Sequence, residues 1–278
     1  MNGPTAPQSV PRDLFRPGAD SDATFAAMVA LLDLQDAARP VRRLRDWALT
    51  VAQPVAGERA VDVGSGTGTV TREMAALVAA NGSALGVEPN ARLRELAQER
   101  SAAVAGVRFV DGLATALPLE DASVDLVWCE RVLQHLDDPQ AAVSEMARVL
   151  RPGGRALLLD SDWGSLVVST MTPEVQAALL LNLTRENHNP FAGRHILGQA
   201  TAAGLVADDD VGSAAMILPS RQLVASGMLA NWLDPAVRVG GLSREVADVA
   251  LRASGEAIER GDFFGAVTMY AFCIRKPG

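Results

Sequence analysis

The feature that most constrains this chain is a glycine-rich turn, Gly64-Ser65-Gly66-Thr67-Gly68, between an apolar run and a helical pattern. The apolar run around Val61 and Val63 predicts a buried strand before the turn, and the pattern from Thr69 predicts a helix after it. Glycine adopts positive φ without steric cost and lets a ligand lie against the backbone. The unpaired N–H groups and the positive dipole end of the helix then point at that ligand. The sequence therefore predicts a binding pocket at this turn.

A single acidic residue follows at the distance that a nucleotide pocket requires. Glu88 stands twenty residues after Gly68, in Gly86-Val87-Glu88-Pro89, where a second strand is expected to end. In doubly wound folds the acid at this place binds the ribose of the ligand. The dinucleotide fingerprint G-x-G-x-x-G is excluded, because the residue three after Gly66 is Thr69. A turn that binds nothing is the alternative interpretation.

Later segments repeat the order of a known family. They are Phe109-Val110-Asp111-Gly112, Val124-Asp125-Leu126-Val127-Trp128, Glu130-Arg131-Val132-Leu133-Gln134-His135-Leu136 and Leu150-Arg151-Pro152-Gly153-Gly154. With the glycine turn and Glu88, they resemble the class I S-adenosylmethionine (SAM)-dependent methyltransferases. The most similar subgroup is methyltransferase type 11, which includes ubiquinone and menaquinone biosynthesis enzymes and small-molecule methyltransferases. The resemblance covers residues 40–160 well and the remainder in outline.

The resemblance implies SAM as cofactor and S-adenosylhomocysteine as its product. The residues that it assigns to the cofactor are Gly64, Ser65, Gly66, Gly68, Glu88, Pro89, Asp111, Gly112, Leu113, Glu130, Arg131 and His135. In this assignment the glycine turn cradles the methionine part and Glu88 accepts from both ribose hydroxyls. Asp111 accepts from the adenine amine, and Glu130 and Arg131 meet the sulfonium and amino-acid end.

Alternating strand and helix patterns predict an α/β, Rossmann-like, doubly wound sheet. The expected strands are residues 60–63, 84–88, 107–111, 124–129, 156–159, part of 205–217, and 263–274. The family resemblance implies seven strands in the order 3-2-1-4-5-7-6, with the last strand antiparallel, and a helical lid. Asn90 and Asp138-Pro139 are expected to begin two of the helices.

The chain divides into a mobile N-terminal tail, residues 1–22, and one methyltransferase domain, residues 23–278. Within the domain we expect roof helices at 23–55 and a lid or substrate insertion at 161–232, which includes a lid helix at 221–232. Three arginines, Arg42, Arg43 and Arg45, fall in the second roof helix. A solvated face is the first interpretation for them, and one arginine that reaches a carboxylate is the alternative.

Composition narrows the partners. A net charge of −8 over 278 residues disfavours nonspecific nucleic-acid binding, and no apolar run approaches the ~20 residues of a membrane span. The two cysteines form no disulfide framework, and no His/Cys/Asp/Glu group has metal-ligand spacing. We therefore expect a cytoplasmic monomer or homodimer that acts on a small-molecule acceptor without nucleic acid, membrane or metal.

Few residues can carry proton transfer. The sequence has three histidines, and a phenol or alcohol acceptor needs a general base, whereas a carbon or amine acceptor can react by positioning alone. The catalytic candidates are His188, in a polar loop, His135, after the fourth strand, and Asp160, near the end of the fifth. A helix end for His188 and structural packing for His135 are the alternatives.

The sequence also offers candidates for binding the acceptor. They are Asp162, Trp163, His188, Phe191 and Trp232. The run from Asp160 to Trp163 is expected at the carboxyl end of the fifth strand, the edge where open α/β sheets bind ligands. A capping turn and core packing are the alternatives.

These observations predict an enzyme that transfers a methyl group to an O or C atom of a small, apolar or aromatic acceptor by in-line displacement. Two alternatives remain open, because a fold does not fix a function. One is a different reaction on the same site, such as cyclisation or decarboxylation. The other is a non-catalytic SAM-binding partner.

Overall fold

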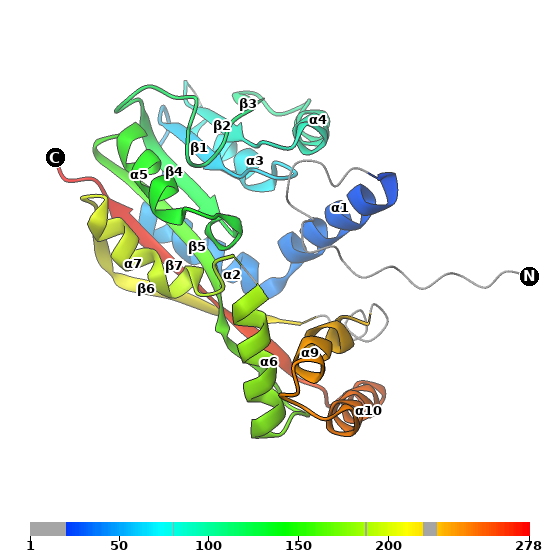
Figure 1. Ribbon diagram of the computed structural model, residues 1–278. Helices are drawn as coiled ribbons and strands as arrows, with labels where there is room; N and C mark the ends of the chain where they lie inside the picture. The colour runs from blue at the N-terminus through cyan, green and yellow to red at the C-terminus, as the bar shows by residue number, and fades with distance from the viewer. Residues whose placement is uncertain (1–20, 80, 187, 219–226) are drawn as a thin grey trace, which may run out of the picture.

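The computed structural model describes residues 21–79, 81–186, 188–218 and 227–278. Its seven-stranded sheet has the order β3-β2-β1-β4-β5-β7-β6 (Figure 1). The strands are β1 (Arg59–Val63), β2 (Ser83–Val87), β3 (Val107–Val110), β4 (Val124–Glu130), β5 (Leu150–Val168), β6 (Val206–Ile217) and β7 (Gly265–Arg275). The predicted Rossmann-like α/β class and strand order are confirmed.

The centre of the sheet is parallel and places three strand ends side by side. In β1, Val63 lies opposite Val87 of β2 and Cys129 of β4. The carboxyl ends of these strands therefore meet at one edge, where the glycine turn and the residues after β2 and β4 emerge. As predicted, β7 runs antiparallel to both of its neighbours, β5 and β6.

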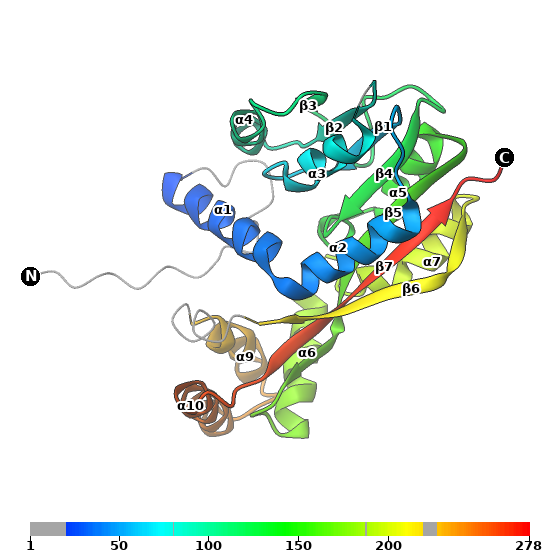
Figure 2. The ribbon, with the colours of Figure 1, turned by 180° about the vertical axis from the view of Figure 1, so that it is seen from behind.

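Helices cover both faces of the sheet (Figure 2). Their bounds are α1 (Asp22–Ala37), α2 (Arg39–Ala52), α3 (Thr69–Val78), α4 (Ala91–Arg100), the 3-10 helix η1 (Leu133–His135), α5 (Pro139–Val149), α6 (Pro173–Glu186), α7 (Ala192–Ala202), α9 (Met228–Arg238) and α10 (Arg244–Arg260). One apolar core joins α2 and α3 to the sheet, and a second joins α5 and α7 to the opposite face. Asn90 and Asp138 cap α4 and α5, as predicted.

The fifth strand is much longer than the predicted 156–159. It runs from Leu150 to Val168, so Asp160 and Asp162 lie inside a strand and not at its end. The prediction was wrong because β7 continues to supply backbone partners beyond Leu159, where β4 ends. Strand length here depends on a partner about a hundred residues away, which local periodicity does not report.

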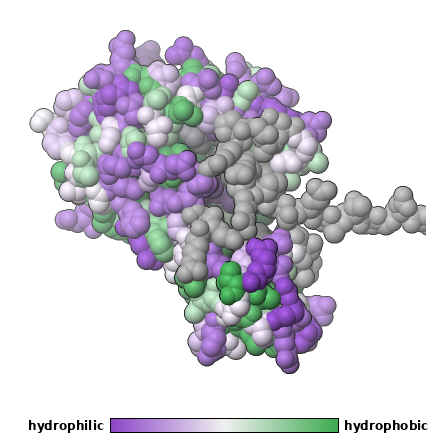
Figure 3. Space-filling view, in the orientation of Figure 1, coloured by the Kyte–Doolittle hydropathy of each residue, from purple (hydrophilic) through white to green (hydrophobic). Residues whose placement is uncertain are grey.

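The extended end of β5 carries a helical lobe, seen at the bottom of Figure 1. Helices α6, α9 and α10 enclose a separate apolar core with Leu166, Val168 and Leu218. The lobe differs from the expected lid at 161–232, because α7 covers the sheet and α10 lies beyond residue 232. The predicted lid helix 221–232 lies partly outside the described residues, and its described part continues to Arg238 as α9. In Figure 3, apolar side chains gather on this lobe.

The roof helices α1 and α2 break at Ala38, two residues before Pro40. Ser21 caps α1, and the expected mobile tail otherwise falls on residues 1–20, outside the described part of the chain. Among the helices of the described segments, none combines the length and apolar character that crossing a membrane requires.

A buried ion pair fixes the second roof helix to the sheet. Arg155 of β5 donates to both carboxylate oxygens of Glu58, each at 2.8 Å, and both residues are 7% exposed. The same guanidinium donates to the carbonyls of Ala52 and Gln53 at the C-terminus of α2. Arg155 therefore satisfies helix-end carbonyls and a buried carboxylate together.

We expect Arg155→Met to lower the free energy of unfolding by about 3–5 kcal/mol, because it leaves Glu58 buried and unpaired. Arg151→Met is the matched control, since Arg151 is 55% exposed and its partner Asp125 also accepts the backbone N–H of Arg59. Its cost should stay below about 1 kcal/mol. Denaturant titration of both variants checks this, and equal losses would contradict the account.

Candidate functional site

The glycine turn takes the backbone conformation that its residues predict. Gly64, Gly66 and Gly68 have φ of +71°, +51° and +77°, in the left-handed region. The N–H groups of Gly64 and Ser65 both donate to the Val87 carbonyl of β2, at 2.8 and 3.1 Å. Helix α3 begins directly after Gly68, which has no side chain to cap it. The first N–H groups of α3 therefore remain available to a ligand at the carboxyl edge.

The turn also needs glycine for space. A Cβ at Gly68 would lie 2.6 Å from Cζ of Phe109, and a Cβ at Gly64 would lie 2.4 Å from Cγ2 of Val132. A Cβ at Gly66 would lie 3.7 Å from Cδ1 of Leu32, so α1 passes over the turn. The turn is thus packed between β3, the turn after β4 and the first roof helix.

Glu88 lies at the end of β2, facing the turn, as predicted. It is 7% exposed and accepts from the backbone N–H groups of Gly66, at 3.0 Å, and Asn90, at 2.9 Å. Burial raises the pKa of this carboxyl, and the two N–H groups oppose that rise. Each carboxylate oxygen accepts a backbone bond and keeps a further lone pair for a ligand hydroxyl.

A second acid at the turn was missed from the sequence. Asp62 of β1 is buried, accepts the Thr71 hydroxyl of α3 at 2.6 Å, and has a pKa raised to about 7 by burial. The signal was present, since an acid inside the apolar run Val61-Asp62-Val63 is costly without a purpose. Asp62 joins the candidate cofactor residues.

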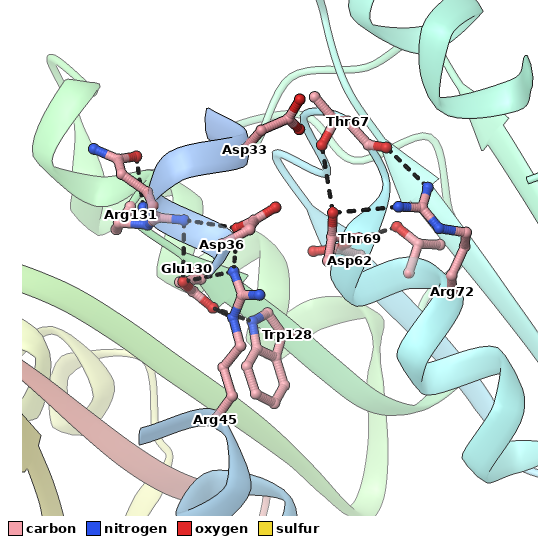
Figure 4. A network of polar contacts seen from close by, with 12 residues as sticks. Asp33, Asp36, Arg45, Asp62, Thr67, Thr69, Arg72, Trp128, Glu130 and Arg131 are labelled. Atoms are coloured by element: carbon pink, nitrogen blue, oxygen red, sulfur yellow. Dashed lines mark hydrogen bonds and ion pairs between the residues drawn. The ribbon is translucent and has the colours of Figure 1, made fainter. Parts of the chain in front are cut away.

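Glu130 and Arg131, at the end of β4, belong to a network of four buried charges (Figure 4). Arg45 of α2 binds both oxygens of Glu130, at 2.7 and 2.9 Å, and Asp36 of α1 at 2.6 Å. Burial alone would raise the pKa of Glu130, but Arg45 and Arg131 hold it below its usual value. For Arg45, which is 5% exposed, the solvated-face interpretation is wrong and the alternative of an arginine that reaches a carboxylate is confirmed, because carboxylates from two other elements meet it there.

The residues expected at the adenine end follow β2 and β3. Asp111 is exposed and pairs with Arg94 at 2.7 Å, and Arg94 also donates to the Glu88 carbonyl. Gly112 and Pro89 are half-buried, and Leu113 is 54% exposed. These positions border the carboxyl edge next to Glu88.

The expected acceptor residues fall into two groups. Trp163, at the extended end of β5, and Trp232 of α9 meet edge to face with ring centroids 6.1 Å apart. Trp163 also donates through Nε1 to the Gln134 side chain, 2.9 Å away, in the turn after β4. Phe191 lies beneath the Arg194 guanidinium at 4.6 Å, and its ring is close to the backbone of Gly164, the residue after Trp163.

The two aspartates of β5 already have partners. Asp160 is fully buried and accepts the N–H groups of Ser161, at 2.8 Å, and Gln134, at 3.3 Å. Burial raises the pKa of Asp160 to about 7. Asp162 binds Arg194 at 2.7 Å and the N–H of Gly164 at 3.0 Å. Both carboxylates hold the backbone around the turn after β4 and the start of α7.

The candidate histidines lie at the surface near the same turn. His188 pairs through Nδ1 with Oδ1 of Asp137 at 2.9 Å, and its side chain is 41% exposed. Asn189 donates its backbone N–H to the Gln134 carbonyl, which brings this loop to the turn after β4. His135, in η1, is also exposed. Within the described segments, no group of three His, Cys, Asp or Glu side chains could hold a metal ion.

Comparison with known proteins agrees with this geometry. Residues 61–158 match the model of a methyltransferase domain, type 11. That segment contains the glycine turn, Glu88, Asp111 and the turn after β4. The matched segment therefore covers the carboxyl edge, and the roof helices and the lobe helices lie outside it.

Two curated relatives share part of the sequence. An uncharacterised 37.1 kDa protein in transposon Tn4556 of Streptomyces fradiae is 33% identical over 236 residues, covering 84% of this chain and 66% of the relative. A demethylmenaquinone methyltransferase of Staphylococcus aureus is 35% identical over 112 residues, covering 40% of this chain and 46% of the relative. The chain thus spans about half to two thirds of the length of these relatives.

Solved structures share the fold at low identity. The YcgJ protein of Bacillus subtilis has a TM-score of 0.60 and 19% identity, covering 85% of this chain and 99% of the other. The [4+2]-cyclase SpnF has a TM-score of 0.53 and 19% identity, covering 85% and 81%. The fold is thus the Rossmann-like methyltransferase fold. The segment that matches the methyltransferase domain model, residues 61–158, lies within this fold.

We expect Gly68→Ala to destabilise the chain by about 1–3 kcal/mol more than Gly204→Ala, because only Gly68 faces a packed neighbour. Gly204 is a matched control, since its φ is +74° and a Cβ there would meet nothing within 4 Å. Positive φ alone should cost Gly204→Ala about 1 kcal/mol. Denaturant titration measures the difference in the free energy of unfolding. Equal losses would show that contact with Phe109 does not require glycine at position 68.

Proposed function

We propose that this chain transfers a methyl group from SAM to an O or C atom of a small, apolar or aromatic acceptor. The observation that carries the proposal is the left-handed glycine turn, followed by the uncapped start of α3 and faced by Glu88. When bound, SAM supplies an activated methyl group whose leaving group is a neutral thioether. The protein then has to orient the acceptor and exclude water.

The proposed cofactor contacts follow the carboxyl edge. The turn Gly64-Ser65-Gly66-Thr67-Gly68 would cradle the methionine part, with Asp62 behind it. Glu88 would accept from the ribose hydroxyls and Asp111 from the adenine amine, beside Pro89, Gly112 and Leu113. Glu130, Arg131 and His135 would lie at the sulfonium and amino-acid end.

The proposed acceptor site lies between the turn after β4 and the helical lobe. Trp163 and Trp232 would provide an apolar, aromatic wall there, with Phe191, Asp162 and His188 beside it. Stacking against tryptophan suits a flat acceptor. The type 11 domain match and the demethylmenaquinone methyltransferase relative support a small acceptor of this kind.

Where the acceptor loses a proton, we propose His188 as the general base. Its Nδ1 lies 2.9 Å from the Asp137 carboxylate, which fixes a tautomer with a proton on Nδ1 and leaves Nε2 able to accept one. His135 is exposed in η1 and is the second candidate. Asp160 is fully buried and is the third.

We place the enzyme in the cytoplasm, as a monomer or homodimer that binds neither metal nor nucleic acid. The net charge of −8 supports a small molecule over a nucleic acid as partner.

A different reaction on the same site is the second candidate function. It is favoured by the fold shared with the [4+2]-cyclase SpnF, and a non-catalytic SAM-binding partner is the third. Mass spectrometry of a turnover with labelled SAM separates them. Methyl transfer requires equal amounts of S-adenosylhomocysteine and methylated product, and a product without added methyl mass would contradict it.

We expect Glu88→Ala to weaken SAM binding about 10²–10⁴-fold, because two hydrogen bonds to a buried charged acceptor are lost and each is worth about 1.5–3 kcal/mol. Glu120→Ala, at an exposed glutamate, is the control and should leave affinity unchanged. Titration calorimetry measures both, and wild-type affinity in Glu88→Ala would remove Glu88 from the site.

We expect His188→Gln to lower kcat about 10²–10⁴-fold on a hydroxyl acceptor, because the general base is lost. SAM affinity should not change. Glu120→Gln, at an exposed glutamate, is the control and should leave kcat unchanged. The assay follows S-adenosylhomocysteine formation with a panel of one- and two-ring phenols and hydroxyquinones. An unchanged kcat on an accepted phenol would exclude His188 as the base.

A further inference from the structure

Arg45 of α2 is a buried cation, since its side chain is 5% exposed. Its guanidinium grips Glu130 through Nε at 2.7 Å and Nη2 at 2.9 Å, and the same Nη2 reaches Asp36 at 2.6 Å. This two-point contact fixes the orientation of the carboxylate as well as its charge, which a lysine cannot do. Glu130 also accepts from Nε1 of Trp128 at 3.3 Å, so its plane is held from two sides.

The network joins three segments that are far apart in the sequence. Asp36 ends α1, Arg45 lies in α2, and Glu130 and Arg131 end β4. Arg131 closes the ring, since its Nη2 lies 3.2 Å from Asp36 and 3.3 Å from Glu130. Two cations and two anions thus balance in a space where each side chain is at most 16% exposed.

Arg131 is the member of the network with an unpartnered polar atom. Its φ is +57°, in the left-handed region, and its backbone N–H donates to the Leu159 carbonyl at 2.8 Å. The side chain is 10% exposed, yet its Nε has no hydrogen-bond partner in the segments that the structure describes. A buried guanidinium N–H without a partner is costly, so it marks a place for an acceptor oxygen.

The network lies beside the glycine turn. Val63, the last residue of β1, pairs with Cys129, and Glu130 is the next residue along β4. In Figure 4 the four charges lie to the left of Thr67 of the turn and Thr69, the first residue of α3. The amino-acid end of a ligand in the turn would therefore approach Arg131.

We propose that Arg45 is a positioning residue for the methyl-transfer site. It holds Glu130 directly and Arg131 through Asp36, so that Arg131 Nε is aimed at the carboxylate of the cofactor's amino-acid end. This inference rests on the proposed function. Arg45 acts only through its partners and touches no ligand itself.

Several charged or titratable groups face Glu130 from the elements around it. They are Asp36 on α1, Arg45 on α2, Asp62 on β1, Glu73 on α3, Cys129 on its own strand, and Arg131 directly after that strand. Arg45 and Arg131 are the cations of this set. Without Arg45, burial and the neighbouring acids raise the pKa of Glu130, so Glu130 gains a proton as pH falls. A protonated Glu130 no longer forms an ion pair with Arg131. The affinity for the ligand therefore decreases as the pH decreases.

The test is calorimetric binding of S-adenosylhomocysteine to the full chain at pH 6 and pH 8, with Arg45→Met and Arg45→Lys. Arg42→Met is the matched control, because Arg42 lies on the same helix and is exposed. Each affinity is divided by that of the wild type at the same pH, which removes the pH effects that the variants share with the wild type. The fitted stoichiometry reports any misfolded fraction.

We expect Arg45→Met to weaken binding about 10–100-fold at pH 8 and several-fold more at pH 6, whereas Arg42→Met stays near wild type. Arg45→Lys should recover part of the affinity and remove the extra loss at pH 6, because it restores the charge near Glu130. If Arg45→Met does not fold, Arg45→Lys carries the test through its weaker binding relative to Arg42→Lys.

Two results would overturn the proposal. One is equal affinity in the Arg45 and Arg42 variants. The other is a loss that is the same at both pH values and is not recovered by lysine, which would assign Arg45 a structural role alone. A wild-type chain that binds no S-adenosylhomocysteine would instead overturn the proposed function.

Discussion

The arrangement of the site depends on the antiparallel pairing of β5 with β7. Their register runs from Arg155 opposite Arg275 to Val168 opposite Gly265, well past Leu159, where β4 ends. Beyond that point the two strands continue as a ribbon that carries the helical lobe. The wall that holds Trp163 and the edge that holds the glycine turn are therefore built on one continuous sheet. The backbone hydrogen bonds between β5 and β7 therefore connect the helical lobe to the carboxyl edge of the sheet.

The carboxyl edge gathers buried acids that a stable core would avoid. Asp62, Glu88, Glu130 and Asp160 all lie there, and each is satisfied differently. Asp62 accepts a threonine hydroxyl, and Glu88 and Asp160 accept backbone N–H groups. Glu130 is paired with arginines. Burying four carboxylates costs stability, and such groups concentrate where a ligand is bound. Their acceptor oxygens suit a ligand that carries hydroxyl groups and a positive charge.

Much of the sheet and of its carboxyl edge could be predicted from the sequence. The glycine turn, Glu88 and the caps at Asn90 and Asp138 are local signals, because each acts within a few residues of itself. The strand order came from the family resemblance. The contacts of the cofactor residues with SAM remain predictions.

What was missed depends on distant partners. The length of β5 follows from β7, and the burial of Arg45 follows from Asp36 and Glu130, one of which lies 85 positions away. A helical pattern shows which face an arginine occupies but not what meets that face. Which helices form the lobe was missed for the same reason. Helix α10 packs against α9 and α6 through an apolar core, and the hydrophobic periodicity of one helix does not show which other helices it contacts.

Titration calorimetry of the wild-type chain with S-adenosylhomocysteine, and separately with NAD, tests the central claim most directly. The account predicts one S-adenosylhomocysteine per chain and no detectable binding of NAD, because the glycine turn and Glu88 form a mononucleoside site without the third dinucleotide glycine. Binding of NAD without binding of S-adenosylhomocysteine would contradict it.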